Sequence, residues 1–141
     1  MPIFSIRPKA TYNSITNRSF VIPKRLTVST EGYKLSYKLI YGATLTGASW
    51  TSVATKSAVE YDESATAYSG GELIYSHFIP QDEDGDDIDL EPFFDVFGRI
   101  IRNAGYAGAG TNVADVLTVV AVNQAVGTTK ARSFMTWAEV K

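Results

Sequence analysis

Apolar and polar residues alternate along much of the chain after residue 18. In the clearest segment, Tyr33–Tyr41, every odd-numbered residue is tyrosine or leucine, and Lys34, Ser36 and Lys38 lie between them. A period of two over nine residues is typical of a half-buried antiparallel strand. Glu31-Gly32 just before this segment is a turn signal, so we expect Arg25–Thr30 and Tyr33–Tyr41 to form a hairpin.

Further short apolar segments follow, each between turn residues. We expect strands at Ala48–Val53, Ala58–Tyr61, Glu72–Ile79, Asp115–Asn123 and Ser133–Val140, the last two on either side of a turn near Gly127. Turn signals recur roughly every eight to twelve residues, which is typical of β-sandwiches and barrels. Enrichment in Thr, Val, Tyr and Ile points the same way. The sequence therefore predicts an all-β, antiparallel protein.

One segment, Pro92–Ala104, has a helical period instead. Its apolar residues recur at offsets that place them on one face of a helix: Phe93, Phe94, Phe97, Ile100, Ile101 and Ala104. Pro92 suits the first position of a helix, and Gly105 suits the position after its end. We expect one short helix here that closes an end of the β core.

The first eighteen residues show no clear period. The residues that interrupt any pattern are Pro2, Pro8, Asn13, Ser14, Thr16 and Asn17. We therefore expect an extended N-terminal arm over residues 1–18, ordered only by a neighbouring molecule, and a single β domain over residues 19–141. A chain of 141 residues with 45% hydrophobic residues suits one globular domain.

Charge is unevenly distributed along the chain. Residues 1–40 carry seven basic side chains and one acid, whereas residues 41–100 carry twelve acids and two bases. This division favours contact between the basic arm of one subunit and the acidic face of another, although solvated loops account for it equally well. The candidate interaction residues are Arg7, Lys9, Tyr12, Arg18, Lys24 and Arg25.

Several site and partner classes are excluded or disfavoured by composition. The chain has no cysteine, which rules out disulfides, cysteine-containing zinc sites and a cysteine nucleophile. Its first residues lack the features of a signal peptide, and no apolar stretch approaches the ~20 residues that span a bilayer. A basic, aromatic N-terminal segment favours nucleic acid, but the overall acidity counts against it. We expect neither a membrane nor a nucleic-acid partner.

The acidic run at 82–89 resembles a cation site at first sight. An EF-hand loop with Gly85 at its sixth position would need an oxygen ligand at its first position, which is Pro80. An EF-hand is therefore excluded. An irregular calcium loop stays open as the alternative to a solvated loop between strands, and we expect no cofactor.

Candidates for catalysis are few. His77 is the only histidine, and alternation places it on one face with Leu73, Tyr75 and Ile79. We therefore expect a partly buried strand residue hydrogen-bonded to backbone. The acids at 60, 62 and 63 leave paired carboxylate chemistry open, but nothing in the sequence places them in a cleft. The glycines at 105, 108 and 110 lack the context of a phosphate loop. The sequence therefore predicts a protein that is not an enzyme.

From about Val21 onward, the chain resembles a recurrent β domain of tailed-bacteriophage virion proteins. The order and spacing of five segments carry this resemblance: Leu45–Trp50, Ser57–Asp62, Gly70–Tyr75, Asp115–Ala121 and Phe134–Glu139. The resemblance implies an antiparallel, jelly-roll-like β-sandwich, usually trimeric, with a structural role. It supplies no catalytic residues.

Within that class, the resemblance and the size favour a capsid decoration (cement) protein. Such a protein binds the major capsid protein and stabilises the shell, so we expect a homotrimer in the virion, assembled in the host cytoplasm. One alternative is a tail- or fibre-associated virion protein. Another, from a different class, is a carbohydrate-binding module, because eight tyrosines and two tryptophans offer aromatic surface to sugar rings.

Overall fold

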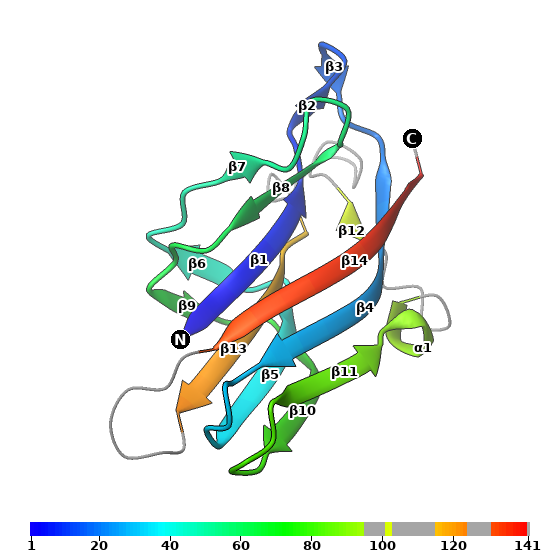
Figure 1. Ribbon diagram of the computed structural model, residues 1–141. Coiled ribbons are helices and arrows are strands. Elements are labelled where there is room, and N and C mark those ends of the chain that lie inside the picture. Colours follow the sequence, from blue (N-terminus) through cyan, green and yellow to red (C-terminus); the bar gives the residue numbers. More distant parts are fainter. Residues whose placement is uncertain (95–100, 103–114, 124–130, 141) are drawn as a thin grey trace.

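The computed structural model describes residues 1–94, 101–102, 115–123 and 131–140, which form two main antiparallel sheets around one core (Figure 1). The first sheet contains β1 (Pro2–Pro8), β5 (Leu35–Tyr41), β7 (Thr51–Ser52), β8 (Val59–Asp62), β10 (Glu72–Ile79) and β13 (Leu117–Asn123). The second contains β4 (Phe20–Ser29), β11 (Gly85–Asp89), β12 (Ile101–Arg102) and β14 (Arg132–Val140). The smaller elements are β2 (Thr11–Tyr12), β3 (Ile15–Thr16), β6 (Thr44–Thr46), β9 (Ala67–Ser69) and α1 (Glu91–Phe94). The predicted all-β, antiparallel class is confirmed.

The first sheet has the strand order β10-β5-β13-β1-β8-β7. The alternation predicted for β5 is confirmed, because Leu35, Tyr37 and Leu39 are buried in the main core. Tyr33 lies before the strand and is exposed. Of the other predicted strands, Glu72–Ile79 has the bounds of β10, and Asp115–Asn123 contains the shorter β13.

The opposite face of the first sheet carries a second, smaller core. Ile40, Ala43 and Val120 are buried there, and Tyr68 of the β6–β9 hairpin packs against them. Because β13 is covered on both faces, it is a nearly continuous apolar run and not an alternating one. This hairpin therefore explains a sequence pattern that a one-sided sheet would not produce.

The second sheet is built around β4. On one side of β4, β14 pairs along the whole length of the strand. On the other side of β4, β11 and β12 pair with different parts of it. The second sheet is therefore three strands wide, against six in the first. Val21, Leu26 and Val28 of β4 supply this sheet's share of the main core.

The prediction of an extended N-terminal arm over residues 1–18 is wrong. Residues 2–8 form β1 in the interior of the first sheet, paired with β13 on one side and β8 on the other. Ile6 is fully buried, and the hydroxyl groups of Ser5 and Thr118 lie 3.1 Å apart in a buried hydrogen bond. Pro2 and Pro8 occupy the ends of the strand, where a missing amide is tolerated. The rest of the segment forms the small β2–β3 hairpin.

The predicted hairpin between residues 25–30 and 33–41 is correct at its turn and wrong in its pairing. Glu31 and Gly32 both have positive φ, as a tight turn requires. The strands on either side, β4 and β5, belong to different sheets. The chain therefore crosses from one layer to the other at this turn.

Three other expectations need correction. The predicted helix is a single turn, α1, and residues 101–102 within its expected span form β12; residues 95–100 and 103–104 lie outside the described residues. The acidic run is not all loop, because its second half forms β11. Strand structure within the predicted segment 48–53 is limited to β7.

The turn expected near Gly127 lies outside the described residues. The predicted strand Ser133–Val140 is confirmed within β14.

Candidate functional site

The predicted interaction residues are spread over two parts of the molecule. Arg7, on β1, lies opposite Glu60 of β8, and its Nε donates a 2.6 Å hydrogen bond to the Glu60 carboxylate. Its guanidinium also stacks over the ring of Trp50 at 4.1 Å. Arg7 therefore ties β1 to the strand and loop beside it.

Lys9 and Tyr12 both bind the loop between β7 and β8. The Lys9 ammonium donates to the carbonyl oxygen of Ala54, and the Tyr12 hydroxyl donates to that of Lys56, each at 3.0 Å. These two contacts attach the base of the β2–β3 hairpin to the body. The hairpin projects at one end of the molecule (Figure 1).

Lys24 and Arg25 lie on β4, far from that hairpin. Lys24 forms a 3.2 Å ion pair with Glu91, and Arg25 binds Asp87 of β11 through two nitrogens at 2.7 and 2.8 Å. The hydrogen bond from Arg25 lowers the pKa of the Asp87 carboxyl below its ordinary value. These two bases neutralise part of the acidic run and help to hold it against β4.

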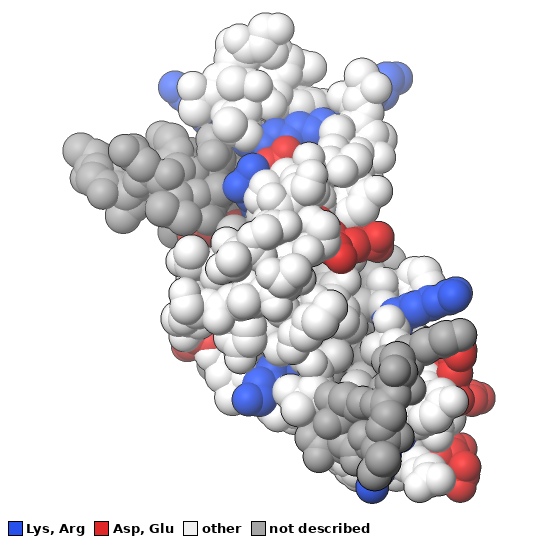
Figure 2. All heavy atoms as spheres, turned by 90° about the vertical axis from the view of Figure 1, so that its left-hand side faces the viewer, with Lys and Arg blue, Asp and Glu red and all other residues white. Residues whose placement is uncertain are grey.

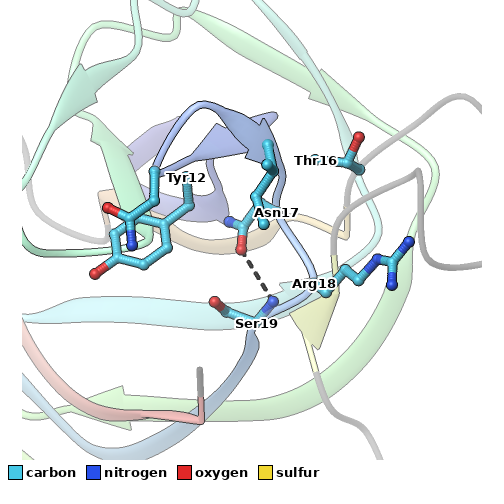
Figure 3. A pocket seen from close by; sticks show the side chains of 7 residues that line it. Tyr12, Thr16, Asn17, Arg18 and Ser19 are labelled. Atoms are coloured by element: carbon cyan, nitrogen blue, oxygen red, sulfur yellow. Dashed lines mark hydrogen bonds between the residues drawn. The ribbon is translucent and has the colours of Figure 1, made fainter.

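Arg18 and Tyr12 lie around a hollow of about 230 Å³ at the hairpin end. Figure 3 shows them on opposite sides of Asn17, whose side-chain oxygen accepts a 2.9 Å hydrogen bond from the Ser19 amide. The Asn17 side-chain nitrogen donates to the carbonyl oxygens of Lys9 and Ala58. Asn17 is buried, and sequence reasoning treated it only as a break in the pattern.

The carboxylates considered for acid–base chemistry have structural partners. Glu60 binds Arg7, whereas buried Asp62 accepts hydrogen bonds from the amides of Ser49, Ser64 and Ala65. Burial by itself raises the pKa of Asp62, but these bonds and one from the Ser64 hydroxyl bring it below the ordinary value. The arrangement stabilises an ionised carboxylate that organises two loops.

His77 lies on β10 beside Tyr75, as predicted, but it is more exposed than the prediction of a partly buried residue. The side chain is about half exposed, and its ring stacks on Tyr75 and lies edge-on to Tyr37. Its Nε2 is 3.7 Å from Asp86, which accepts a 2.5 Å hydrogen bond from the Tyr37 hydroxyl. Burial and this hydrogen bond raise the pKa of Tyr37. The bulge in β10 between residues 73 and 75 places Leu73 opposite Ile40 and off the face that Tyr75 and His77 share.

The structure describes all residues of the acidic run at 82–89. Among the described residues, no group of three or more His, Asp or Glu side chains is placed to hold a metal ion. In the described segments, no helix has the length and apolar character to cross a membrane.

A second hollow, of about 250 Å³, lies between the two sheets along β14 and was not found from the sequence. Its lining is mostly aromatic and apolar: Phe4, Val53, Tyr61, Glu63, Ser133, Phe134, Met135 and Trp137. We call these residues the β14 groove. Phe134 is the most exposed of its large apolar side chains, at 62%. The Ser133 hydroxyl has no hydrogen-bond partner among the described residues.

Figure 2 views the side of the molecule that faces left in Figure 1. Figure 2 shows that most of this face is neither acidic nor basic, and that acidic side chains gather at its lower right. No protein-family model, curated protein or solved structure matches the chain. The β14 groove is lined mostly by aromatic and apolar side chains.

Proposed function

We propose that this chain is a non-catalytic structural protein of a tailed-bacteriophage virion that works by binding neighbouring subunits. The observation that carries the proposal is the β14 groove, an apolar hollow beside a long strand at the edge of its sheet. Apolar surface of this kind contributes roughly 25 cal/mol per Å² when a partner covers it, before the costs of association. The virion assignment is supported by the sequence resemblance.

Within this proposal, the preferred role is capsid decoration. The chain would form a homotrimer and bind the major capsid protein, and many symmetric copies would add avidity to a modest single contact. The jelly-roll-like form of the two-sheet fold belongs to the same proposal. An experimental structure that includes residues 95–114 and 124–130 would test it through the complete strand order.

Electron cryo-microscopy of particles from the genome that encodes the chain tests the location. Decoration predicts copies distributed over the icosahedral shell. Copies confined to the tail or to one vertex would support the tail- or fibre-associated alternative and reject decoration. Absence of the chain from purified particles, measured by mass spectrometry, would reject the virion assignment itself.

A carbohydrate-binding role is the second candidate, because aromatic rings line the β14 groove and sugars stack on such rings. A glycan array separates it from protein assembly. Binding to a defined glycan that is lost in Trp137→Ala, and retained in a Tyr33→Ala control outside the groove, would favour the carbohydrate role. Glycan binding unaffected by Trp137→Ala would exclude the groove as its site.

A further inference from the structure

We propose that the β14 groove binds an extended segment of a neighbouring protein, which adds to the free edge of β14 as a further strand of the second sheet. The occupant is a β-strand with an apolar side chain at every second position, because alternate residues of an added strand face the groove. This inference rests on the proposed assembly function and names its mode of contact.

The first argument compares the sheet edges. Exposed edges are normally protected by shortness, charge, proline or bulges. The edge strand β7 has two residues, and β11 carries three aspartates among its five residues. β14 has nine residues, no charge and no proline from Ser133 to Ala138, and a regular register with β4 from Arg132 to Thr136, before an irregularity between Thr136 and Trp137. Among the described residues β14 pairs only with β4, so its outer edge is the less protected edge of the second sheet.

The second argument is the difference in width between the sheets. Beyond β14, the first sheet continues with β8 and β7, which lie to its left in Figure 1. Inward-facing Phe4 and Tyr61 stack on each other there and line the groove instead of being covered by a fourth strand. A strand added to β14 would lie over these rings. Among the described residues, the groove is thus the position of a strand that the second sheet lacks.

The other long edge, β10, does not offer the same opening. Beside β10 the space between the sheets is occupied by an aromatic cluster of Tyr37, Tyr75, His77 and Phe93. The neighbouring β11 and the turn before it are strongly acidic. An incoming apolar strand is therefore better accommodated at β14.

The volume and charge of the groove define the occupant further. About 250 Å³ is below the roughly 300–1,000 Å³ of a typical small-molecule site, so side chains fit it better than a free ligand. Arg132 at the start of β14 and Glu63 at the groove are both exposed, and neither forms an ion pair within the described part. Both lie toward the start of β14, because Ala58, just before β8, contacts Glu139 at the other end of the strand. A strand with an acid and a base near the same end would complement both.

A second copy of the chain is a poorer occupant. Suppose that β14 of a second copy paired with β14 of the first. The six-stranded sheet of the second copy would then have to occupy the space that β8 and β7 of the first copy already fill. A single strand from a different protein avoids that collision. Self-association through β14 is therefore an outcome that would reject the proposal.

The test uses the full chain as bait for a display library of random nine-residue peptides. We expect selected peptides to alternate apolar and polar residues and to lose at least about tenfold in affinity with Phe134→Asp, which is about 1.4 kcal/mol. Val140→Asp, on the same face of β14 and also exposed, is the matched control and should bind as the wild type does. Glu63→Lys provides a second groove variant should Phe134→Asp fail to fold.

Backbone readouts separate strand addition from simple apolar contact. Bound peptide should protect the outward-facing amides of residues 132–136 from hydrogen exchange, and N-methylation on one edge of the peptide should abolish binding. Peptides that bind equally to wild type and Phe134→Asp would overturn the proposal. So would a dimer of the free chain that Phe134→Asp dissociates, measured by ultracentrifugation. Particle localisation is independent of these results, so failure here would leave the assembly function itself standing.

Discussion

The two edges of the second sheet differ although both pair with the same strand, β4. β11 is short and acidic and is held by ion pairs and hydrogen bonds, whereas β14 is long and apolar and borders an open groove. Charge on an edge strand discourages further pairing, and an uncharged edge permits it. The comparison indicates that the molecule is closed on the β11 side and available for contact on the β14 side.

The largest effect is expected where β11 approaches β4 most closely. A Cβ atom at Gly85 would lie 2.1 Å from the carbonyl oxygen of Val28, so Gly85→Ala must displace the strand. We expect a loss of about 3–5 kcal/mol in the free energy of unfolding, measured by urea denaturation. Gly42→Ala is the control, because a Cβ atom at Gly42 would contact nothing and only the positive φ of this residue disfavours a side chain. We expect this variant to lose about 1 kcal/mol in the free energy of unfolding. Equal losses in both variants would contradict a tightly seated β11.

The next effect concerns the loops on the groove side. Asp62→Ala removes the acceptor for three backbone amides and one hydroxyl, and we expect a loss of about 2–4 kcal/mol. Glu63→Ala, its exposed neighbour, should change stability by less than about 0.5 kcal/mol. A neutral result for Asp62→Ala would show that the groove wall does not depend on this carboxylate.

The same carboxylate predicts a dependence on pH. Its folded-state pKa lies below the ordinary value, so its contribution is present above the unfolded pKa of about 3.9 and is lost as pH falls through the folded pKa. The stability difference between wild type and Asp62→Asn should therefore be constant above about pH 5 and narrow in more acidic solution. A difference that widens with acidification would contradict the assigned direction.

A smaller effect is expected from the hydrogen bond between Tyr37 and Asp86, on the β11 side. Tyr37→Phe leaves the aromatic packing and removes a 2.5 Å bond to a carboxylate, at a cost of about 2 kcal/mol in unfolding experiments. The control Tyr33→Phe changes an exposed ring before β5 and should be neutral. Comparable losses of stability in both variants would show that the hydrogen bond from the Tyr37 hydroxyl to Asp86 does not stabilise the fold.

The smallest effect is expected from the exposed pair of Arg25 and Asp87. Its two hydrogen bonds are well formed, but both side chains are about half exposed, and solvent and salt screen such pairs. Arg25→Gln should lower the melting temperature only slightly, and the difference should vanish at high salt. A large loss that persists at 1 M salt would mean that this pair, and not the close backbone approach, fixes β11.

Local patterns identified some strands well. The alternation around Tyr37 and the apolar run at 72–79 indicated β5 and β10, because the side-chain period of a strand is visible within a few residues. The bulge at residues 73–75 then placed Leu73 differently from simple alternation, since one extra residue shifts the register. The local pattern was informative about strands and less so about the direction of individual side chains.

The N-terminal strand shows why other features were missed. β1 pairs with residues 59–62 and 117–120, which are distant in sequence, so nothing near residues 2–8 signals its partners. The β14 groove has the same origin, because Phe4, Tyr61 and Phe134 come from three separate strands. The acids of β11 were expected in a loop, and Arg25 and Tyr37 compensate them only in the folded chain.

The sequence by itself determined that this protein is all-β and antiparallel, because alternation fixes which residues of a strand face a core. Only the tertiary structure decided which strands become neighbours and which edge has no partner strand among the described residues. The physical reason is that one strand's alternation is compatible with many partners, and the choice among them depends on long-range packing. The open edge at β14 is a consequence of that choice, as one sheet is six strands wide and the other three.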